Sequence, residues 1–413
     1  MEQLFNIDLK KLSFSSQNDE IERKKNFELF LKKGLPNKKD ENWKFSDLNS
    51  IIKKIFKEIS NNDEFKFDKK IELIEDFEHN HIILINGMFK SCDLKFEDKE
   101  KVKIGSLNSI DDLYEKPNSN LYFLNKALSL GGFSVEVQEN YKCKKPVIIY
   151  NYFTSSLDNK IINNSNKITL YPNSELTLIE YNFGEKSKFL KNTFEKININ
   201  DGALLKSIII QKNKSNGFFY KNISGSQGYN SSYQNFILSS GLAFNKIDQN
   251  ISLTKENSNC FILSGICLGK NEHQEIKTQI NHLAPNCKSY QKIKNVLESD
   301  SNGVYQGKIF VKDIAQKTDA YQLSKALILD DKSEFNAKPE LEIYADDVKC
   351  SHGSTSGSID ADAIHYLMTR GIKLTEAKKL LITGFLNEVF DNIPEQKIKT
   401  FLEKTIKEQI NGV

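Results

Sequence analysis

The chain has 413 residues, and its 58 basic and 55 acidic residues leave a net charge of +3. This near-neutral balance argues against bulk nucleic-acid binding, which needs a concentrated positive field, while the length allows two or three domains with a large core. The six cysteines are widely spaced without a CxxC pair, and no apolar signal core or membrane-length run of about 18 apolar residues occurs, so we expect a cytoplasmic protein with reduced thiols that binds no membrane.

Residues 1–131 form a first zone with mixed helical and strand signals. Apolar residues recur at helical spacing over 21–33, and the following Gly34 predicts the end of that helix. Residues 81–89 predict a strand, an Asn-Gly turn and a second strand, which together make a β-hairpin.

Residues 132–358 form a second zone that shows almost no helical periodicity. Short β-rich segments recur there, each broken by a polar corner rich in Asn, Asp, Gly or Ser. The absence of intervening helices argues against a βαβ sheet, and the pattern leaves a β-solenoid and two sandwiches equally open. The clearest of these segments cover residues 167–181, 196–210, 250–268 and 326–344.

Residues 359–413 predict a helical zone, with Asp360 as an N-cap and Gly371 after the end of the first helix. A second helix is predicted over 375–393. It carries two apolar stripes, whereas one stripe suffices to dock a surface helix. The second stripe therefore contacts either a partner protein or the neighbouring C-terminal helices. The stripes consist of Ala377, Leu381, Phe385 and Val389, and of Ile382, Leu386, Phe390 and Ile393.

Several segments match a known family closely. The most specific is PELEIYADDVKCSHG at 339–353, and weaker matches include LPNKKDENWKFSDL at 35–48, with the lone Trp43. The chain thus resembles the SufB/SufD family of iron–sulfur cluster assembly proteins over most of its length. Further close matches lie at 282–297, 304–329, 366–372 and 380–390.

Within this family the chain looks like a SufD-type member. Leu323 stands where SufB-type chains carry a cysteine, and the stretch 349–352 departs from their Glu-His-Glu-like sequence. The resemblance implies a mainly β protein with a right-handed parallel β-helix core over 132–358, an N-terminal α/β region and a C-terminal helical region. It also implies a non-catalytic scaffold subunit, and no GxxxxGK[ST] phosphate loop is present.

The resemblance further implies partners and cargo. SufB pairs with the β-helix, and the ATPase SufC docks on the C-terminal helices at 359–413, for which Phe385, Leu386, Val389 and Phe390 are the predicted contacts. An iron–sulfur cluster forms transiently in the complex and is not held stably by this chain alone. A reduced flavin in the complex and a homodimer of the isolated chain are further expectations.

Cys350 and His352 are the candidate metal ligands. Residues two apart on a strand point the same way, and a thiolate with an imidazole suits iron or another soft-to-borderline metal. A C-x-H pair alone is more often structural. The resemblance implies that His352 is a ligand for a nascent cluster at the SufB interface. For Cys350 it leaves two roles open, a ligand or a packing residue. Two ligands do not complete a site, so the others must come from SufB.

Three rival functions remain open. A SufB-like homodimer would build clusters without a separate partner, and the leucine at 323 argues against it. A carbohydrate-active β-helix enzyme would use an acidic cleft, for which Glu342 and Asp346 are the candidates. An inert solenoid would need none of these residues.

The remaining cysteine and histidine positions of note are expected to be structural. Cys260 and Cys267 are predicted to pack on opposite faces of one strand, and His282 to be a core or corner histidine.

Overall fold

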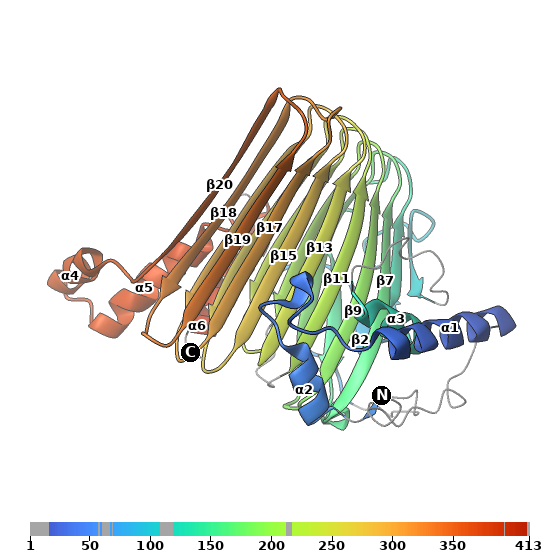
Figure 1. Cartoon of the computed structure of the whole chain (residues 1–413), viewed down its shortest axis with the longest axis horizontal. Coiled ribbons are helices and arrows are strands. Elements are labelled where there is room, and N and C mark those ends of the chain that lie inside the picture. The colour runs from blue at the N-terminus through green and yellow to red at the C-terminus, as the bar shows by residue number, and fades with distance from the viewer. Residues whose placement is uncertain are drawn as a thin grey trace.

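The computed structural model shows a parallel β-helix (Figure 1). From β5 to β20 the chain alternates between two sheets, and each strand pairs in parallel with the strand two places along the sequence, over about eight turns. This confirms the predicted β-helix and removes the alternative of two sandwiches. The structure describes residues 16–56, 58–59, 67, 69–107, 119–211, 217–391 and 393–410.

Sheet A contains the odd-numbered strands of the β-helix together with two N-terminal strands. Its strands are β1 (Glu58–Ile59), β4 (Val102–Ser106), β5 (Phe133–Val137), β7 (Lys160–Leu170), β9 (Leu190–Ile199), β11 (Phe218–Gln227), β13 (Phe244–Leu253), β15 (His273–His282), β17 (Asn302–Val311) and β19 (Glu334–Ile343).

Sheet B contains the even-numbered strands and the predicted hairpin, whose turn residues Asn86 and Gly87 both have positive φ. Strands before residue 132 therefore extend both sheets, and the sheets themselves do not mark the domain boundary predicted there. The strands of sheet B are β2 (Asn80–Ile85), β3 (Met88–Asp93), β6 (Val147–Phe153), β8 (Glu175–Gly184), β10 (Leu204–Gln211), β12 (Ser232–Ser239), β14 (Asn259–Leu268), β16 (Lys288–Leu297), β18 (Thr318–Ile328) and β20 (Val348–Gly357).

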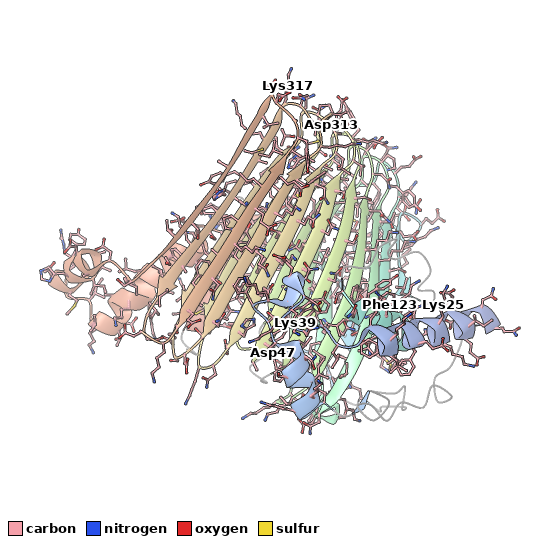
Figure 2. All side chains as sticks on the ribbon, in the orientation of Figure 1. Lys25, Lys39, Asp47, Phe123, Asp313 and Lys317 are labelled. Atoms are coloured by element: carbon pink, nitrogen blue, oxygen red, sulfur yellow. The ribbon has the colours of Figure 1, made fainter. Side chains whose placement is uncertain are left out.

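The corners from sheet A to sheet B explain the recurring asparagines of the sequence. Asn230 and Asn257 adopt the left-handed conformation, which asparagine tolerates better than most residues. The amide of Asn230 donates to the carbonyl of Glu256 at 3.0 Å, so each corner hydrogen-bonds to the next turn. Figure 2 shows Asp313 and Lys317, from a later corner of this series, at the same end of the strands.

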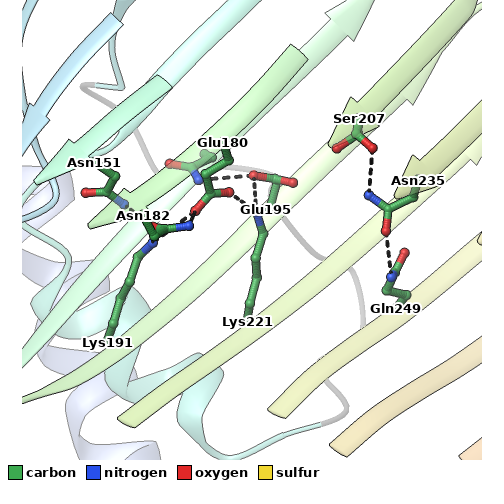
Figure 3. Close-up of polar contacts among 10 residues, drawn as sticks. Asn151, Glu180, Asn182, Lys191, Glu195, Ser207, Lys221, Asn235 and Gln249 are labelled. Atoms are coloured by element: carbon green, nitrogen blue, oxygen red, sulfur yellow. Dashed lines mark hydrogen bonds and ion pairs between the residues drawn. The ribbon is translucent and has the colours of Figure 1, made fainter. Parts of the chain in front are cut away.

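Aliphatic side chains fill the space between the two sheets, but a charged cluster interrupts this core at β8, β9 and β11 (Figure 3). The Lys191 ammonium lies 3.1 Å from the Glu180 carboxylate, and the Lys221 ammonium lies 3.1 Å from the Glu195 carboxylate and also contacts Glu180. Burial opposes ionisation of Glu180, but the two lysines outweigh it and lower the pKa of this carboxyl. The cluster is therefore an internally neutralised buried network.

Lys221→Met should lower the free energy of unfolding by about 3–5 kcal/mol, because it leaves the buried carboxylates of Glu180 and Glu195 without their shared cation. Urea denaturation followed by circular dichroism measures the change. Lys255→Met is the matched control, since it removes an exposed ion pair with Asp201 that contributes little. Equal denaturation curves for the two variants would contradict a structural role for the cluster.

The N-terminal segment covers part of the outer face of sheet A. Trp43 is buried there, and the Lys246 ammonium lies 5.1 Å from its ring centroid. Ser46 Oγ lies 2.8 Å from His273 Nε2 and donates to Glu275, which also pairs with Lys246. The family-like stretch at 35–48 is thus an anchor for this cover. The helices of this N-terminal cover are α1 (Gln17–Lys33), η2 (Glu41–Trp43), α2 (Leu48–Ile55) and α3 (Leu121–Leu128).

The C-terminal helices α5 (Leu374–Asn387) and α6 (Gln396–Ile410) cover the outer face of sheet B. Most residues of the two apolar stripes pack inside the chain: Leu386, Val389 and Phe390 are at most 1% exposed, and Phe385 is half-buried against the same cluster. Their contacts are therefore intramolecular in this structure. Asp360 caps α4 (Ala361–Thr369) as predicted, and no described helix is long and apolar enough to cross a membrane.

Candidate functional site

The two ends of the β-helix differ. At the N-terminal end, β3 pairs antiparallel with β2 and β4 pairs antiparallel with β5, and these short strands end the two sheets. At the other end, within the described chain, β19 pairs only with β17, and β20 pairs only with β18 (Figure 1). Both final strands therefore keep an unpaired edge of ten residues. Such an edge is a template for pairing with another chain.

Cys350 and His352 lie on β20 at this open end. They stand beside Ala320 and Gln322 of β18, whose buried side chains point into the space between the sheets. The candidate ligands therefore share the inner face of sheet B, as the strand alternation predicts. Cys350 packs against the apolar cluster around Ile309, whereas His352 is exposed.

The Ser/Gly/Thr stretch after His352 has the composition of a turn, but residues 353–357 continue β20 to Gly357. The pairing of β20 with β18 explains this, because the backbone hydrogen bonds of the ladder override the weak strand preference of glycine. His352 therefore sits in the middle of an edge strand.

The chemistry of the pair is asymmetric. Burial, together with the nearby Asp319, raises the pKa of the Cys350 thiol, so it is not primed as a free thiolate. Behind His352, the Gln322 side chain is held by the Tyr305 hydroxyl, which donates to it at 3.1 Å, and it donates to the Glu340 carbonyl at 3.4 Å. The exposed imidazole is thus the freer ligand, on a well-ordered support.

The described part of the chain contains no group of three or more His, Cys, Asp or Glu residues arranged to hold a metal ion. A cluster iron needs four ligands, so Cys350 and His352 can serve only as part of a site. Any further ligands would have to come from outside the described residues.

Exposed apolar side chains surround this end of the β-helix, and sequence reasoning missed them. Leu341 and Ile343 on β19 are 36% and 37% exposed, and the adjacent Tyr344 is 61% exposed. In earlier turns the corresponding positions are buried, as Ile309 and Val311 are on β17. The sequence carries one indication of this exposure: the helical zone follows β20, so no further turn of the β-helix covers these side chains.

The acidic residues of the carbohydrate-enzyme alternative do not form a carboxylate pair on one strand. Glu342 pairs with Lys308 at 2.5 Å and accepts a hydrogen bond from the Tyr344 hydroxyl at 2.9 Å. Asp346 lies in the corner between β19 and β20. The two free, facing carboxylates that glycoside hydrolysis uses are therefore not presented by this strand.

His282 has no role at this site. It is fully buried at the end of β15, where its Nε2 lies 2.9 Å from Ser289 Oγ, and its Nδ1 has no partner within the described residues. Burial lowers the pKa of this imidazole to about 4. It is a core histidine, in agreement with the prediction, and it must stay neutral in the folded protein.

This histidine predicts a pH dependence of stability. Because the folded pKa lies near 4 and the ordinary value is 6.5, the unfolded chain binds the extra proton between these values. Stability should therefore be complete above pH 6.5 and fall on acidification, by about 1.4 kcal/mol per pH unit from His282 alone. Urea denaturation at several pH values tests this, with His282→Asn expected to flatten the profile relative to the parent chain; an unchanged slope would contradict it.

Comparisons with known proteins identify the family of this chain. The family model described as "SUF system FeS cluster assembly, SufBD core domain" matches residues 152–385, and that described as "SufBD protein N-terminal region" matches residues 3–149. The iron–sulfur cluster assembly protein SufD of Escherichia coli is 25% identical over 390 residues, which cover 92% of this chain and 91% of that protein.

Two further relatives agree. A SufBD family protein of Synechocystis is 25% identical over 406 residues, covering 90% of this chain and 87% of its own length. SufD of Bacillus subtilis is 32% identical over 146 residues, 35% of this chain and 33% of that protein. The core model alone spans more than half of the sequence. The chain belongs to the SufBD family of iron–sulfur cluster assembly proteins, and SufD proteins are among its relatives.

Proposed function

We propose that this chain is the SufD-type scaffold subunit of a SufB–SufC–SufD complex, in which His352 supplies one ligand to a nascent iron–sulfur cluster. The position of His352 supports this proposal most directly: it is an exposed imidazole on the edge strand at the open end of the β-helix. The cluster is cargo of the complex, and SufB supplies the remaining ligands. The chain itself does no catalysis in this account.

The SufB contact in this proposal uses the open end. The unpaired edges of β19 and β20 offer backbone groups for strand pairing, and Leu341, Ile343 and Tyr344 offer apolar area beside them. Pairing there would cover the apolar side chains and bring ligands of SufB next to His352. The same surface gives the isolated chain a way to form a homodimer.

The SufC contact in this proposal uses the exposed helices instead of the buried stripes. Figure 1 shows α4 and the start of α5 projecting away from the β-helix. No residue of α4 is buried, and Tyr366, Met368, Leu374 and Leu380 are all at least 45% exposed. We place the docking surface on these four residues instead of on the predicted contacts Phe385, Leu386, Val389 and Phe390, of which the last three are buried and Phe385 is half-buried.

A buried lysine connects the docking helix to the β-helix. Lys294 of β16 donates to the Phe385 carbonyl in the last turn of α5 at 2.7 Å, pairs with Glu388, and lies 4.3 Å from the Phe385 ring centroid. A cation at a helix C-terminus satisfies its free carbonyls and complements its dipole. Movement of SufC would therefore pass through α5 into sheet B rather than being absorbed by a loose hinge.

Two separate surfaces predict two separable defects. In cells that express all three subunits, Leu341→Asp with Ile343→Asp should abolish co-purification of SufB and leave SufC bound, because charge at the open end opposes its burial. Leu380→Glu with Tyr366→Glu should do the reverse. Affinity purification through this chain measures both. Loss of both partners in either variant, or of neither, would contradict the assignment of the surfaces.

A further inference from the structure

A polar pocket of about 350 Å³ lies between η2 and the outer face of sheet A. Its floor is formed by neighbouring residues of three adjacent strands: Lys277 of β15 stands beside Gln306 of β17, which stands beside Lys338 of β19. Gln279 and Lys308 form the next row, and Asn42 of η2 lies against Lys277. The pocket is therefore built from ammonium and carboxamide groups on a rigid sheet.

Three lysines and three glutamates lie in and beside this pocket, but they do not pair one to one. Lys338 pairs with both Glu41 and Glu340, and Lys308 pairs with Glu342. Lys277 lies within 4 Å of no carboxylate in the described chain, and its hydrogen bond is to the amide oxygen of Asn42. One half-buried cation therefore faces the pocket with donor capacity to spare, because an ammonium carries three N–H groups.

Burial of this cation has a cost that a ligand would offset. Desolvation lowers the pKa of Lys277, whereas the carboxylates of Asp248, Glu275 and the pocket residue Glu340 act in the opposite direction. An anionic oxygen in direct contact would stabilise the charged form and form a charge-assisted hydrogen bond. Gln279 and Gln306 each direct one amide hydrogen to a neighbouring side chain and keep a second one for a ligand.

We propose that this pocket binds a small molecule through an oxyanion, a phosphate or a carboxylate group, with Lys277 as the charged contact. The site is independent of His352, since it lies on the outer face of sheet A, whereas His352 lies on the inner face of sheet B. It goes beyond the scaffold role, and its ligand is defined by one negative group and a size below the pocket volume.

The test uses the full chain with sodium phosphate or sodium succinate, each compared with sodium chloride at equal ionic strength. A ligand of the folded state raises the melting temperature in a saturable way. We expect saturable stabilisation by phosphate or succinate, and a loss of affinity of about tenfold or more in Lys277→Met. Lys277→Arg should retain binding, and Lys312→Met, an exposed lysine elsewhere, is the charge-matched control.

The two probes separate the sources of the oxyanion, since saturation by phosphate alone assigns a phosphate group and saturation by succinate alone assigns a carboxylate. If Lys277→Met does not fold, Gln279→Leu provides the second variant and should weaken binding several-fold. The proposal is overturned if neither anion stabilises the parent chain beyond chloride. It is also overturned if Lys312→Met loses as much affinity as Lys277→Met, because the effect would then be general screening.

Discussion

Removal of residues 360–413 is expected to leave an insoluble protein rather than a folded β-helix without its SufC-docking region. In the structure, α5 and α6 form one apolar cluster with outward-facing residues of sheet B, among them Ile179, Ile208, Ile210, Phe236, Leu238, Leu263 and Val296.

The size of this surface decides the outcome. Fully burying one aliphatic or aromatic side chain contributes about 1.5–3 kcal/mol, so exposing this set costs on the order of 15 kcal/mol. That is as large as the entire stability of a typical domain, about 5–15 kcal/mol. The exposed sheet face would also be an aggregation site. Soluble yield and size-exclusion chromatography measure the effect.

A matched control separates the covering role of α5 and α6 from the exposed helix before them. Replacing 361–372 with a Gly/Ser linker of equal length removes α4, which has no buried residue, and keeps α5 and α6 in place. This variant should remain soluble with parental circular dichroism. A soluble, monomeric chain after removal of 360–413 would show that sheet B does not need its helical cover.

His352→Ala should abolish growth of a Suf-dependent strain while the three subunits still assemble. The side chain is exposed on an edge strand, so its loss should change stability by no more than about 0.5 kcal/mol. Loss of one cluster ligand cannot be repaired by the others, because each iron needs its full ligand set. Cys350→Ala is the comparison, and we expect a milder defect, since this thiol packs against the core and its pKa is raised.

Different results of this experiment have different meanings. Normal growth with His352→Ala would remove the residue from the mechanism. Poor growth with a dissociated complex would make it an interface residue rather than a ligand. Equal defects in His352→Ala and Cys350→Ala would indicate that both side chains are ligands, which the sequence leaves open.

Local rules predicted much of this structure from the sequence. The Asn86-Gly87 turn, the Asp360 cap and the strand alternation that places Cys350 and His352 on one face all follow from short-range geometry. The same alternation correctly separated Cys260, inside the β-helix, from Cys267, under the C-terminal helices. Each of these features depends only on neighbouring residues along the chain.

The features that sequence reasoning missed depend on long-range packing. The two stripes of the predicted helix at 375–393 left open whether a partner or the chain itself contacts the second one. Only the fold shows that sheet B and the neighbouring helices do so, and we therefore propose the docking surface at Tyr366 and Leu380. The buried pairing of Lys221 with Glu180 joins residues 41 positions apart, and hydrophobic patterning carries no signal for it. The open end likewise follows from topology, not composition.

The most direct test of the proposed role of His352 is the iron and acid-labile sulfide content of the purified three-subunit complex, prepared anaerobically with either the parent chain or His352→Ala. If His352 is a cluster ligand, the two preparations should have equal subunit ratios, with iron and sulfide present in the parent complex and largely lost from the variant. Equal iron and sulfide in both complexes would contradict the claim that His352 is a ligand of the nascent cluster.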